Sequence, residues 1–550
     1  MATKGRGQIL GTMMDDPLLL SSLLEQAAVR FADTLVIGRD VDGTIGRQTY
    51  AETDRRVRRL ASALVARGVK FGDRIASLAW NTRAHFELFH AIPSFGAVLH
   101  TVNPRLSDGD IAYVIAEAGD SWLFYDAGTL PLVERVAPLL PAGMTLVFMG
   151  AEVPDTPLPA VLSMEALIRE AEGEMAWPVF DERTAAVICF TSGTTGRPKG
   201  VAYSHRSTFL SALAMSLADW VGGYPVATGE SFMPVASLYH SNGWQMPYTA
   251  PMNGHQLVLP GRHFDAASLV ELLRLGEVSV SAGVPTVWTG IADHLDHTGE
   301  DLPHLRAVMM AGMRVPERLF ERFAARGIAV QQAWGMTEAP GVGLTTPAPG
   351  SHRLAEETRR TLMLSAQGRL NVLTRSRIMD EAGAELARDG RASGLLQVKG
   401  PLIAGRYLGQ DPAEASAWLD TGDIARIHPD GSIELVDRAK DVIKSGGEWI
   451  SSLEIEKAAL THPRIGQAAA IAADHARWQE RPVLVCALAS GNAGSEALDE
   501  TELRAHLASQ LPRWWLPDAI VFLPELPLTG TGKIDKKSLK AWFAGILNRT

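Results

Sequence analysis

Hydrophobic positions follow two different spacings along the first two thirds of the chain. Compact apolar runs predict buried strands at residues 74–79, 96–101, 122–125 and 145–148. Residues 18–32 and those after Thr49 have apolar side chains at helical spacing, and Thr49 and Glu52 are spaced as in a capping box. Helices that alternate with short strands predict a layered α/β fold with mainly parallel sheets.

The alternation continues beyond a more polar stretch, residues 152–178, which we expect to be a surface connection. Ser204 is placed to cap a helix that runs to about Trp220. Further strands are predicted at residues 184–190, 201–203, 256–260, 279–285, 308–314 and 328–334. Ligands of open α/β sheets gather where strand ends meet loops, so functional residues are expected at several of these junctions.

The last third of the chain has a different pattern. From about Ala382, hairpin signals appear, such as residues 429–432 between two β-favouring runs. After Asp437 a smaller unit is expected, with helices near residues 453–460 and 502–510 and a strand at 483–489. We therefore predict an N-terminal domain at residues 1–437 and a C-terminal domain at residues 438–550.

A glycine-rich stretch, residues 191–200, lies between two of the predicted strands. Its glycines let the backbone come close to a ligand, and donors for phosphate oxygens come from Thr191, Ser192, Thr194, Thr195 and Lys199. The stretch is not a Walker A loop, because only two residues separate Gly193 from Gly196 and Lys199 is followed by glycine. An ordinary Gly/Thr turn has the same composition, so a phosphate site needs support from elsewhere in the chain.

Four further stretches carry candidate chemistry. Residues 334–338 follow a predicted strand and end in Glu338, an oxygen ligand suited to Mg²⁺. Residues 418–423 end in Asp423, residues 437–451 carry three cations and two glycines, and residues 529–534 place Lys533 in a glycine-rich loop. Taken singly, these stretches are more often a capped helix start, a turn, a charged linker and a solvated tail lysine, respectively.

Charge and composition exclude some functions. The net charge of −10 leaves no basic footprint for nucleic acid. Both cysteines, Cys189 and Cys486, lie in apolar runs and are expected to be buried thiols of a reducing compartment. No run of about 18 apolar residues predicts a membrane helix, and residues 1–16 contain no hydrophobic signal segment. We expect a cytoplasmic protein.

Together the motifs resemble those of one family. The glycine-rich loop, Tyr239-His240, residues 334–338, Thr421-Gly422-Asp423 with Arg438, and Gly532-Lys533 occur in the order typical of the adenylate-forming superfamily. Residues 240–244 and 444–451 are most similar to the acyl-CoA synthetase branch, near bacterial medium- and long-chain fatty-acid–CoA ligases and the ligase for 3-(methylthio)propionate. The resemblance implies a large N-terminal domain of layered α/β subdomains with a small β-rich subdomain, and a small mobile C-terminal α+β domain.

The resemblance also implies a two-step reaction with ATP, Mg²⁺ and CoA. A carboxylic acid attacks the α-phosphate to give an acyl-adenylate and pyrophosphate, and CoA then displaces AMP. Lys533 would oppose the repulsion between the acid and the phosphate, Glu338 with Thr194 would hold Mg²⁺, and His240 would lie near the acid. The implied nucleotide residues are Thr191, Ser192, Gly193, Thr194, Thr195, Gly196, Lys199, Trp334, Gly335, Met336, Thr337, Asp423, Arg438, Lys444 and Trp449.

The resemblance extends to the two other substrates. The CoA site would include the hinge residue Lys440 with Gly446 and Gly447. The implied acyl pocket consists of Tyr239, His240, Trp244, Val284, Ala311, Gly312 and Met313. Relatives carry small residues where this chain has Met309 to Arg314, so we expect a shorter or reshaped pocket and a medium-chain or similar modest-sized apolar acid.

Some points remain open at the level of the sequence. A second departure, residues 370–373, borders the nucleotide site and leaves its loop geometry open. One alternative function is transfer of the acyl group to a carrier-protein thiol, or its oxidation as in luciferases. Another is a non-catalytic, nucleotide-binding regulatory protein, which the intact Lys533, Glu338 and Thr194 argue against. A homodimer is implied only by the resemblance.

Overall fold

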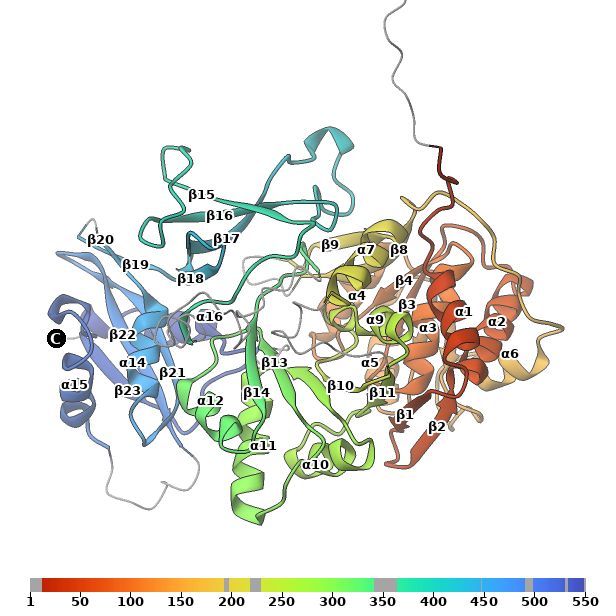
Figure 1. Cartoon of the computed structure of the whole chain (residues 1–550), viewed down its shortest axis with the longest axis horizontal. Helices are drawn as coiled ribbons and strands as arrows, with labels where there is room; N and C mark the ends of the chain where they lie inside the picture. Colours follow the sequence, from red (N-terminus) through yellow and green to blue (C-terminus); the bar gives the residue numbers. More distant parts are fainter. Residues whose placement is uncertain are drawn as a thin grey trace, which may run out of the picture.

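Two large sheets organise the first 340 residues, and two smaller sheets follow them (Figure 1). The structure is a computed structural model that describes residues 12–191, 197–217, 229–340, 364–446, 448–489, 498–529 and 533–548. Within these ranges, no helix is both long enough and apolar enough to cross a membrane. The four sheets confirm the predicted α/β fold class, with a β-rich unit and a C-terminal unit after the layered part.

The first sheet has the strand order β7-β6-β5-β3-β4-β8-β9, and its strands are parallel except for β9. The glycine-rich stretch joins β8 to β9, and so short a connection can only join antiparallel neighbours. The predicted strands of this sheet are confirmed. Their bounds are β3 (Arg74–Leu78), β4 (Val98–Thr101), β5 (Trp122–Tyr125), β6 (Thr145–Phe148), β7 (Leu162–Ser163), β8 (Ala185–Phe190) and β9 (Gly200–Ser204).

The second sheet has the order β14-β13-β12-β10-β11-β1-β2, and β2 is its antiparallel member. The sequence did not predict the hairpin of β1 and β2, or β10, because polar residues and Pro234 interrupt their apolar runs. The strands are β1 (Leu35–Arg39), β2 (Ile45–Thr49), β10 (Ser231–Val235), β11 (Gln256–Leu259), β12 (Val280–Gly283), β13 (Ala307–Ala311) and β14 (Ala329–Ala333).

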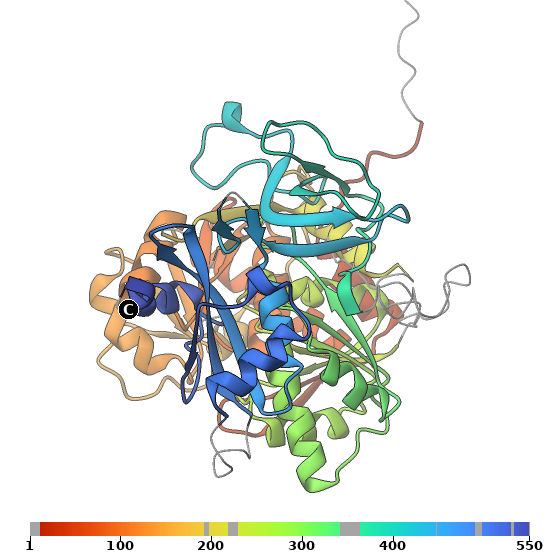
Figure 2. The ribbon, with the colours of Figure 1, turned by 90° about the vertical axis from the view of Figure 1, so that its left-hand side faces the viewer.

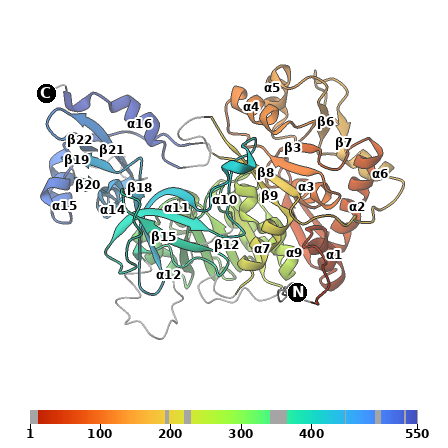
Figure 3. The same ribbon diagram turned by 90° about the horizontal axis from the view of Figure 1, so that it is seen from above.

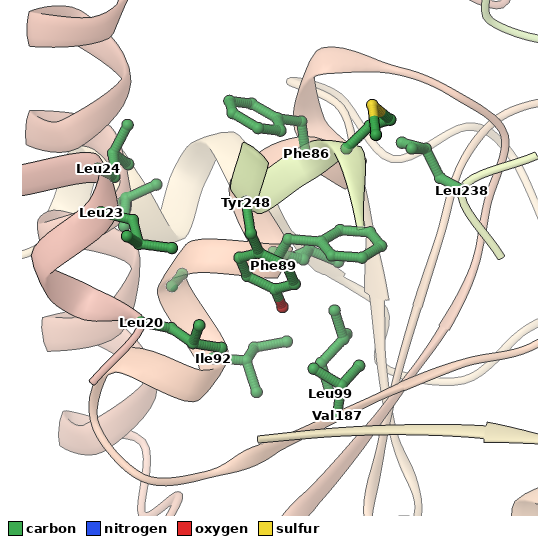
Figure 4. Packing of buried hydrophobic residues seen from close by; sticks show 14 of the residues in the cluster. Leu20, Leu23, Leu24, Phe86, Phe89, Ile92, Leu99, Val187, Leu238 and Tyr248 are labelled. Atoms are coloured by element: carbon green, nitrogen blue, oxygen red, sulfur yellow. The ribbon is translucent and has the colours of Figure 1, made fainter. Parts of the chain in front are cut away.

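The main hydrophobic core joins the two large sheets. Side chains from both sheets pack there with α1 (Ser21–Arg30), α2 (Tyr50–Ala66), α3 (Arg83–Ser94), α7 (His205–Met215) and α9 (Met246–Asn253). Figure 4 shows Phe86 and Phe89 of α3 and Tyr248 of α9 among leucines of α1 and Leu99 of β4. Burial of these large apolar side chains is the main term that holds the two sheets together.

The outer faces of both sheets are covered by further helices. A second cluster packs α10 (Ala266–Leu275), α11 (Pro285–Thr298) and α12 (Glu317–Ala324) on the second sheet, and a third packs α4 (Asp108–Ala118) and α5 (Leu130–Val136) on the first. The expected surface connection at residues 152–178 is wrong in part. It contains α6 (Met164–Glu170), whose Met164 and Leu167 are buried in the main core.

Helix starts agree with the predicted caps. The Thr49 side chain accepts from the Glu52 amide, and the Glu52 carboxylate accepts from the Thr49 amide at 2.8 Å, which completes the capping box of α2. Ser204 caps α7 by accepting from the Ser207 amide at 3.0 Å. This helix ends at Met215 rather than near Trp220, and residues 218–228 lie outside the described part of the chain.

The β-rich unit is a four-stranded antiparallel sheet with the order β15-β16-β17-β18. Its strands are β15 (Arg375–Met379), β16 (Ser393–Lys399), β17 (Leu419–Ile427) and β18 (Ile433–Arg438). The predicted turn at residues 429–432 joins β17 to β18, as expected. Since β18 ends at Arg438, the domain boundary predicted between residues 437 and 438 falls at the end of a strand, and it stays a prediction.

The C-terminal sheet pairs β20, β19, β22 and β21 in that order, and β23 joins β22. Figure 3 shows this unit, coloured blue, at the opposite end of the molecule from the first sheet, and in Figure 2 it faces the viewer. Helices α14 and α15 cover one face and α16 the other. The alanine-rich β21 was not predicted, because alanine favours helix. The elements are β19 (Ile443–Ser445), β20 (Glu448–Ile450), α14 (Ser452–Leu460), β21 (Ile465–His475), β22 (Gln479–Leu488), α15 (Glu500–Ala508), β23 (Ala519–Phe522) and α16 (Lys536–Phe543).

Candidate functional site

Three predicted site segments follow neighbouring parallel strands of the second sheet. Val284 comes directly after β12, Gly312 after β13 and Trp334 after β14, and the three strands are adjacent. Because the carboxyl ends of parallel strands meet at one edge of a sheet, these residues share one rim. The site is therefore assembled at the position where open α/β sheets bind their ligands.

The ends of the glycine-rich loop are held together by backbone contacts. The Thr191 amide donates to the Lys199 carbonyl at 2.9 Å, and the Lys199 amide donates to Thr191 Oγ1 at 3.1 Å. The Leu408 amide donates to the Gly200 carbonyl at 2.7 Å, which joins the loop to the segment before the β-rich unit's third strand. The remaining predicted phosphate residues, Ser192, Gly193, Thr194, Thr195 and Gly196, lie outside the described residues.

Lys199 and Glu338 are linked by a tyrosine that the sequence did not single out. The Lys199 ammonium lies 4.8 Å from the ring centroid of Tyr407, and the Tyr407 hydroxyl donates to Glu338 Oε1 at 2.6 Å. Burial and the nearby Glu338 carboxylate raise the pKa of Tyr407, so its phenol stays protonated as a donor. The turn around Tyr407 has no motif of its own, and only the fold brings it to these two residues.

The segment after β14 has a fixed backbone. The Tyr203 hydroxyl donates to the Thr337 carbonyl at 2.6 Å, and the Ala339 amide donates to the Met336 carbonyl at 2.9 Å. Thr337 and Glu338 are buried, whereas Gly335 is exposed and Met336 is half-buried. This arrangement leaves the backbone at Gly335 accessible to a ligand.

A buried carboxylate joins two other predicted residues. Asp423 Oδ2 accepts from Trp334 Nε1 at 2.9 Å, and Asp423 Oδ1 lies 2.8 Å from Arg438 Nε. Asp423 and Arg438 face each other across β17 and β18. Burial raises the pKa of Asp423, while the Arg438 charge and the Trp334 hydrogen bond act in the opposite direction. The three side chains form one connected group, and their role in a nucleotide site stays a prediction.

Lys533 reaches this group from the C-terminal unit. A Cβ placed on Gly312, where φ is +94°, would lie 3.3 Å from Lys533 Cε and 3.5 Å from a Val284 methyl carbon. Burial lowers the pKa of Lys533 to about 8, and the positive charge of Arg438 adds to this shift. The fold thus brings Lys533 to the rim of the second sheet, between the expected nucleotide and acyl residues.

His240 begins an unusual turn. Burial lowers the pKa of His240 to about 4, and the Lys533 charge contributes, so the imidazole is neutral near pH 7. The five residues Ser241 to Gln245 all have positive φ, including four that are not glycine. Such backbone is strained for L-residues, and it persists only where surrounding contacts hold it. Here the buried Asn242 donates to Thr101 Oγ1 at 2.9 Å.

The expected acyl residues lie on both sides of this turn. A small pocket beside the site is lined by Tyr239 and His240 together with Thr191, Phe190 and residues of β4 and α4. Trp244 is half-buried and packs on the main core, to which Ala311 also belongs. Met309 faces the same core, whereas Met310 is in the cluster on the outer face of the sheet. Only one of these two methionines can therefore alter a cavity between the sheets.

The predicted CoA residues, Lys440, Gly446 and Gly447, are close in sequence to Lys444 and Trp449, which were predicted for the nucleotide. The Lys444 ammonium is 5.8 Å from the Trp449 ring, and the two residues face each other across β19 and β20. The Gly446 amide donates to the Trp478 carbonyl, and a Cβ on Gly446 would lie 2.9 Å from the Trp478 ring. The carbonyl of Lys440 accepts from Lys540 Nζ at 3.0 Å, and Gly447 lies outside the described residues. The hydrogen bonds of Lys440 and Gly446 are within their own unit. The charge of Lys440 nevertheless acts on Lys533, where it helps to lower the pKa.

Residues 370–373, the second departure, form a local turn. Asn371 Oδ1 accepts from the Leu373 amide at 3.0 Å and from Thr374 Oγ1 at 3.1 Å, and Val372 is exposed. Just before this turn, Gln367 Oε1 accepts from the Leu435 amide at 2.8 Å. The loop is thus fixed against β18 by its own polar side chains.

Family models match most of the chain. The model of the AMP-binding enzyme matches residues 24–408, and the model of the AMP-binding enzyme C-terminal domain matches residues 454–533. The long-chain-fatty-acid–CoA ligase of Thermus thermophilus is 42% identical over 97% of both chains. The 3-methylmercaptopropionyl-CoA ligase of Ruegeria lacuscaerulensis is 38% identical over 98% of this chain and 100% of its own. The medium-chain-fatty-acid–CoA ligase of Ectopseudomonas oleovorans is 38% identical over 98% of this chain and 99% of its own.

Solved structures have the same fold. The anthranilate CoA ligase AuaEII in complex with anthranoyl-AMP superposes with a TM-score of 0.84 at 21% identity, over 98% of this chain and 99% of its own. ATP-bound MatB from Rhodopseudomonas palustris superposes with a TM-score of 0.80 at 23% identity, over 96% of this chain and 99% of its own. At this level of identity the superpositions support the fold, including its large N-terminal part and small C-terminal part.

Proposed function

This chain belongs to the AMP-binding enzyme family and is an acid–CoA ligase that uses ATP, and we propose that its acid is a medium-chain fatty acid or a similar modest-sized apolar acid. The observation that carries the assignment of the site is the position of Lys533 beside Gly312, next to the group of Trp334, Asp423 and Arg438. A cation, a ribose acceptor and a rim of strand ends meet there. Activation of a carboxylate by ATP needs this combination.

The proposed nucleotide site follows from the charges of the described residues. Asp423 and Arg438 would bind the ribose hydroxyls, Trp334 would lie against the adenine, and Lys199 with the glycine-rich loop would hold the terminal phosphates. The partly buried ion pair and the indole fix the orientation of the carboxylate before ATP binds. Such preorganisation lowers the cost of positioning the substrate.

Magnesium would enter with ATP. Glu338 offers a buried carboxylate whose orientation is fixed by Tyr407, and among the described residues no cluster of three or more histidine, cysteine or acidic side chains could hold a metal by itself. One protein carboxylate together with phosphate oxygens and water is a usual environment for Mg²⁺ in nucleotide sites. Glu338 therefore fits Mg²⁺ bound as part of the ATP complex, whereas Thr194, the second predicted oxygen donor, lies outside the described residues.

The rate of adenylation should decrease with rising pH as Lys533 loses its proton. Its pKa of about 8 lies well below the ordinary lysine value, so the cation is present below pH 8 and is lost as the pH rises through 8. We expect kcat/KM for pyrophosphate formation to fall about tenfold per pH unit above this value. Pyrophosphate release is measured between pH 6 and 10. In Lys533→Arg, whose guanidinium stays charged, any residual activity should lack this decline. A decline of equal size in both proteins would contradict the assignment.

The choice of acid rests on the acyl side of the site. The relatives are named as ligases of long-chain and medium-chain fatty acids and of methylmercaptopropionate, all acids with an apolar tail. Met309 in the main core and the half-buried Met313 add side-chain volume near the expected pocket. Extra volume in a close-packed interior shortens a cavity, so a modest-sized tail is preferred over a long one.

A panel of acids tests the proposal. Purified protein is assayed for pyrophosphate and for acyl-CoA with acids from about C3 to C16, together with aryl, methylthio and cyclic acids. We expect kcat/KM to rise about fourfold per methylene up to a medium-chain optimum, because each buried methylene contributes about 0.8 kcal/mol. For longer acids kcat/KM should fall, because the pocket cannot accommodate the additional methylenes. A maximum at C16 or at aryl acids would overturn the proposed substrate class.

The same assay also tests the two alternative functions. Pyrophosphate release without acyl-CoA would favour transfer to a carrier-protein thiol. Bound ATP without pyrophosphate release for any acid would favour a regulatory, nucleotide-binding role. A cytoplasmic location, a homodimer and a domain boundary at Arg438 remain proposals that follow from the sequence.

A further inference from the structure

Two arginines of the second sheet's rim contact the C-terminal unit. Figure 1 shows α12, which follows this rim, beside that unit. Arg314 lies two residues after Gly312, and its Nη1 donates to Glu454 Oε1 of α14 at 2.9 Å. Arg318, in the first turn of α12, donates from Nη1 to the Ile465 carbonyl at 3.0 Å and from Nη2 to the Gly466 carbonyl at 3.4 Å. Both side chains therefore bridge parts of the chain that are far apart in sequence.

The acceptor of Arg318 is created by an irregularity of β21. The pairing of β21 with β22 shifts register between Ile465 and Gln467, so Gly466 has no opposite residue in the ladder. At a bulge, the extra residue leaves the regular hydrogen-bonding pattern. The guanidinium of Arg318 then binds the carbonyls of Ile465 and Gly466 with its two terminal nitrogens, a fork geometry that lysine cannot reproduce.

Helix α14 connects the Arg314 contact to Lys533. Glu454 is in the first turn of α14, and Glu456, two residues further along the same helix, lies 2.6 Å from Lys536 Nζ. Lys536 also donates to Ser452 Oγ at 2.8 Å, and it begins α16 only three residues after Lys533. A force that holds α14 against the rim therefore also holds the segment that carries Lys533.

We propose that Arg314 and Arg318 form a latch that holds the C-terminal unit in the orientation in which Lys533 faces Gly312. They are positioning residues for adenylation, and this inference rests on the proposed function. The latch must open when CoA, whose expected residues lie elsewhere in the C-terminal unit, reacts with the acyl-adenylate. The latch also explains why this chain has arginine at position 314, in the segment Met309 to Arg314 where relatives carry small residues. A small residue at position 314 could not reach Glu454.

The contacts have the strength that a reversible latch needs. The Arg314 side chain is 14% exposed and Glu454 is 34% exposed, so water screens their attraction only in part. Charge-assisted hydrogen bonds in such surroundings are stronger than those of an exposed ion pair. They are still weak enough to break within a catalytic cycle, because among the described residues the hydrophobic clusters of the C-terminal unit include no residue of the N-terminal part.

The test separates the two half-reactions. Arg314→Ala, Arg318→Ala and the double variant are assayed for ATP–pyrophosphate exchange with the preferred acid, and for acyl-CoA formation from supplied acyl-adenylate and CoA. We expect exchange to fall about tenfold in each single variant, equivalent to about 1.4 kcal/mol, and acyl-CoA formation to stay within about twofold of the parent protein. Arg314→Lys keeps a cation near Glu454 and should recover much of the exchange activity.

Arg322→Ala is the matched control. Arg322 is on the same helix as Arg318, but its guanidinium contacts Asp293 at 2.7 Å and Asp296 at 2.5 Å, both of α11 in the same N-terminal part. It should leave the ratio of the two half-reactions unchanged. Equal losses in both half-reactions, or the same behaviour for Arg318→Ala and Arg322→Ala, would overturn the latch. If the parent protein performs neither half-reaction with any acid, the proposed function fails instead, and that result is visible before any variant is made.

Discussion

Replacing Lys533 with alanine is expected to reduce adenylation about a thousandfold while acyl-CoA formation from supplied acyl-adenylate stays near the parent rate. The lysine is the cation at the rim, and loss of one preorganised group that stabilises developing charge costs about 10²- to 10³-fold in rate. The second half-reaction has no carboxylate that must approach a triphosphate, so it does not need this charge. ATP–pyrophosphate exchange and thioester formation, measured separately on the same preparation, check the split.

Lys537→Ala provides the control for that variant. Lys537 is exposed on α16, four residues after Lys533. The Lys537→Ala variant therefore removes the same charge from the same segment. The rates of both half-reactions in Lys537→Ala should match those of the parent protein. An equal loss of both half-reactions in Lys533→Ala would mean that the lysine supports the fold of the site rather than the first chemical step.

The second large effect is expected for Asp423→Asn. The variant removes the charge that pairs with Arg438 and that would accept from the ribose hydroxyls. Two charge-assisted hydrogen bonds together are worth about 3 kcal/mol, so KM for ATP should rise about 100-fold, while kcat at saturating ATP changes much less. Because asparagine has the same shape, it can still accept from Trp334 Nε1, and the indole should stay in place. Initial rates over a range of ATP concentrations give both constants.

Glu434→Gln is the corresponding control. Glu434 pairs with Arg426 at 3.4 Å across the same two strands, β17 and β18, so the variant removes a similar cross-strand ion pair outside the site. We expect its KM for ATP to be unchanged. If the two variants raise KM equally, then the effect comes from a weakened β-rich unit and not from contact with the nucleotide.

Much of the local structure could be predicted from the sequence. The strands of the first sheet, the capping box at Thr49 and Glu52, and the turn at residues 429–432 depend on neighbours within a few positions, where periodicity and side-chain chemistry are decisive. The less regular elements were missed. The alanine-rich β21 and the polar hairpin of β1 and β2 become strands only because neighbouring strands pair with them.

The sequence by itself determined the family and the set of residues with suitable chemistry, because motif order and spacing are properties of the chain. Only the tertiary structure decided which of them meet. Tyr407 connects Lys199 to Glu338, and Arg314 reaches Glu454 across 140 positions of sequence. Such contacts depend on how separate sheets pack and on where the C-terminal unit lies, and no local pattern encodes a distance between two surfaces. The position of Lys533 beside Gly312 is the clearest case, since a lysine in a glycine-rich tail becomes a half-buried cation at this rim only through that packing.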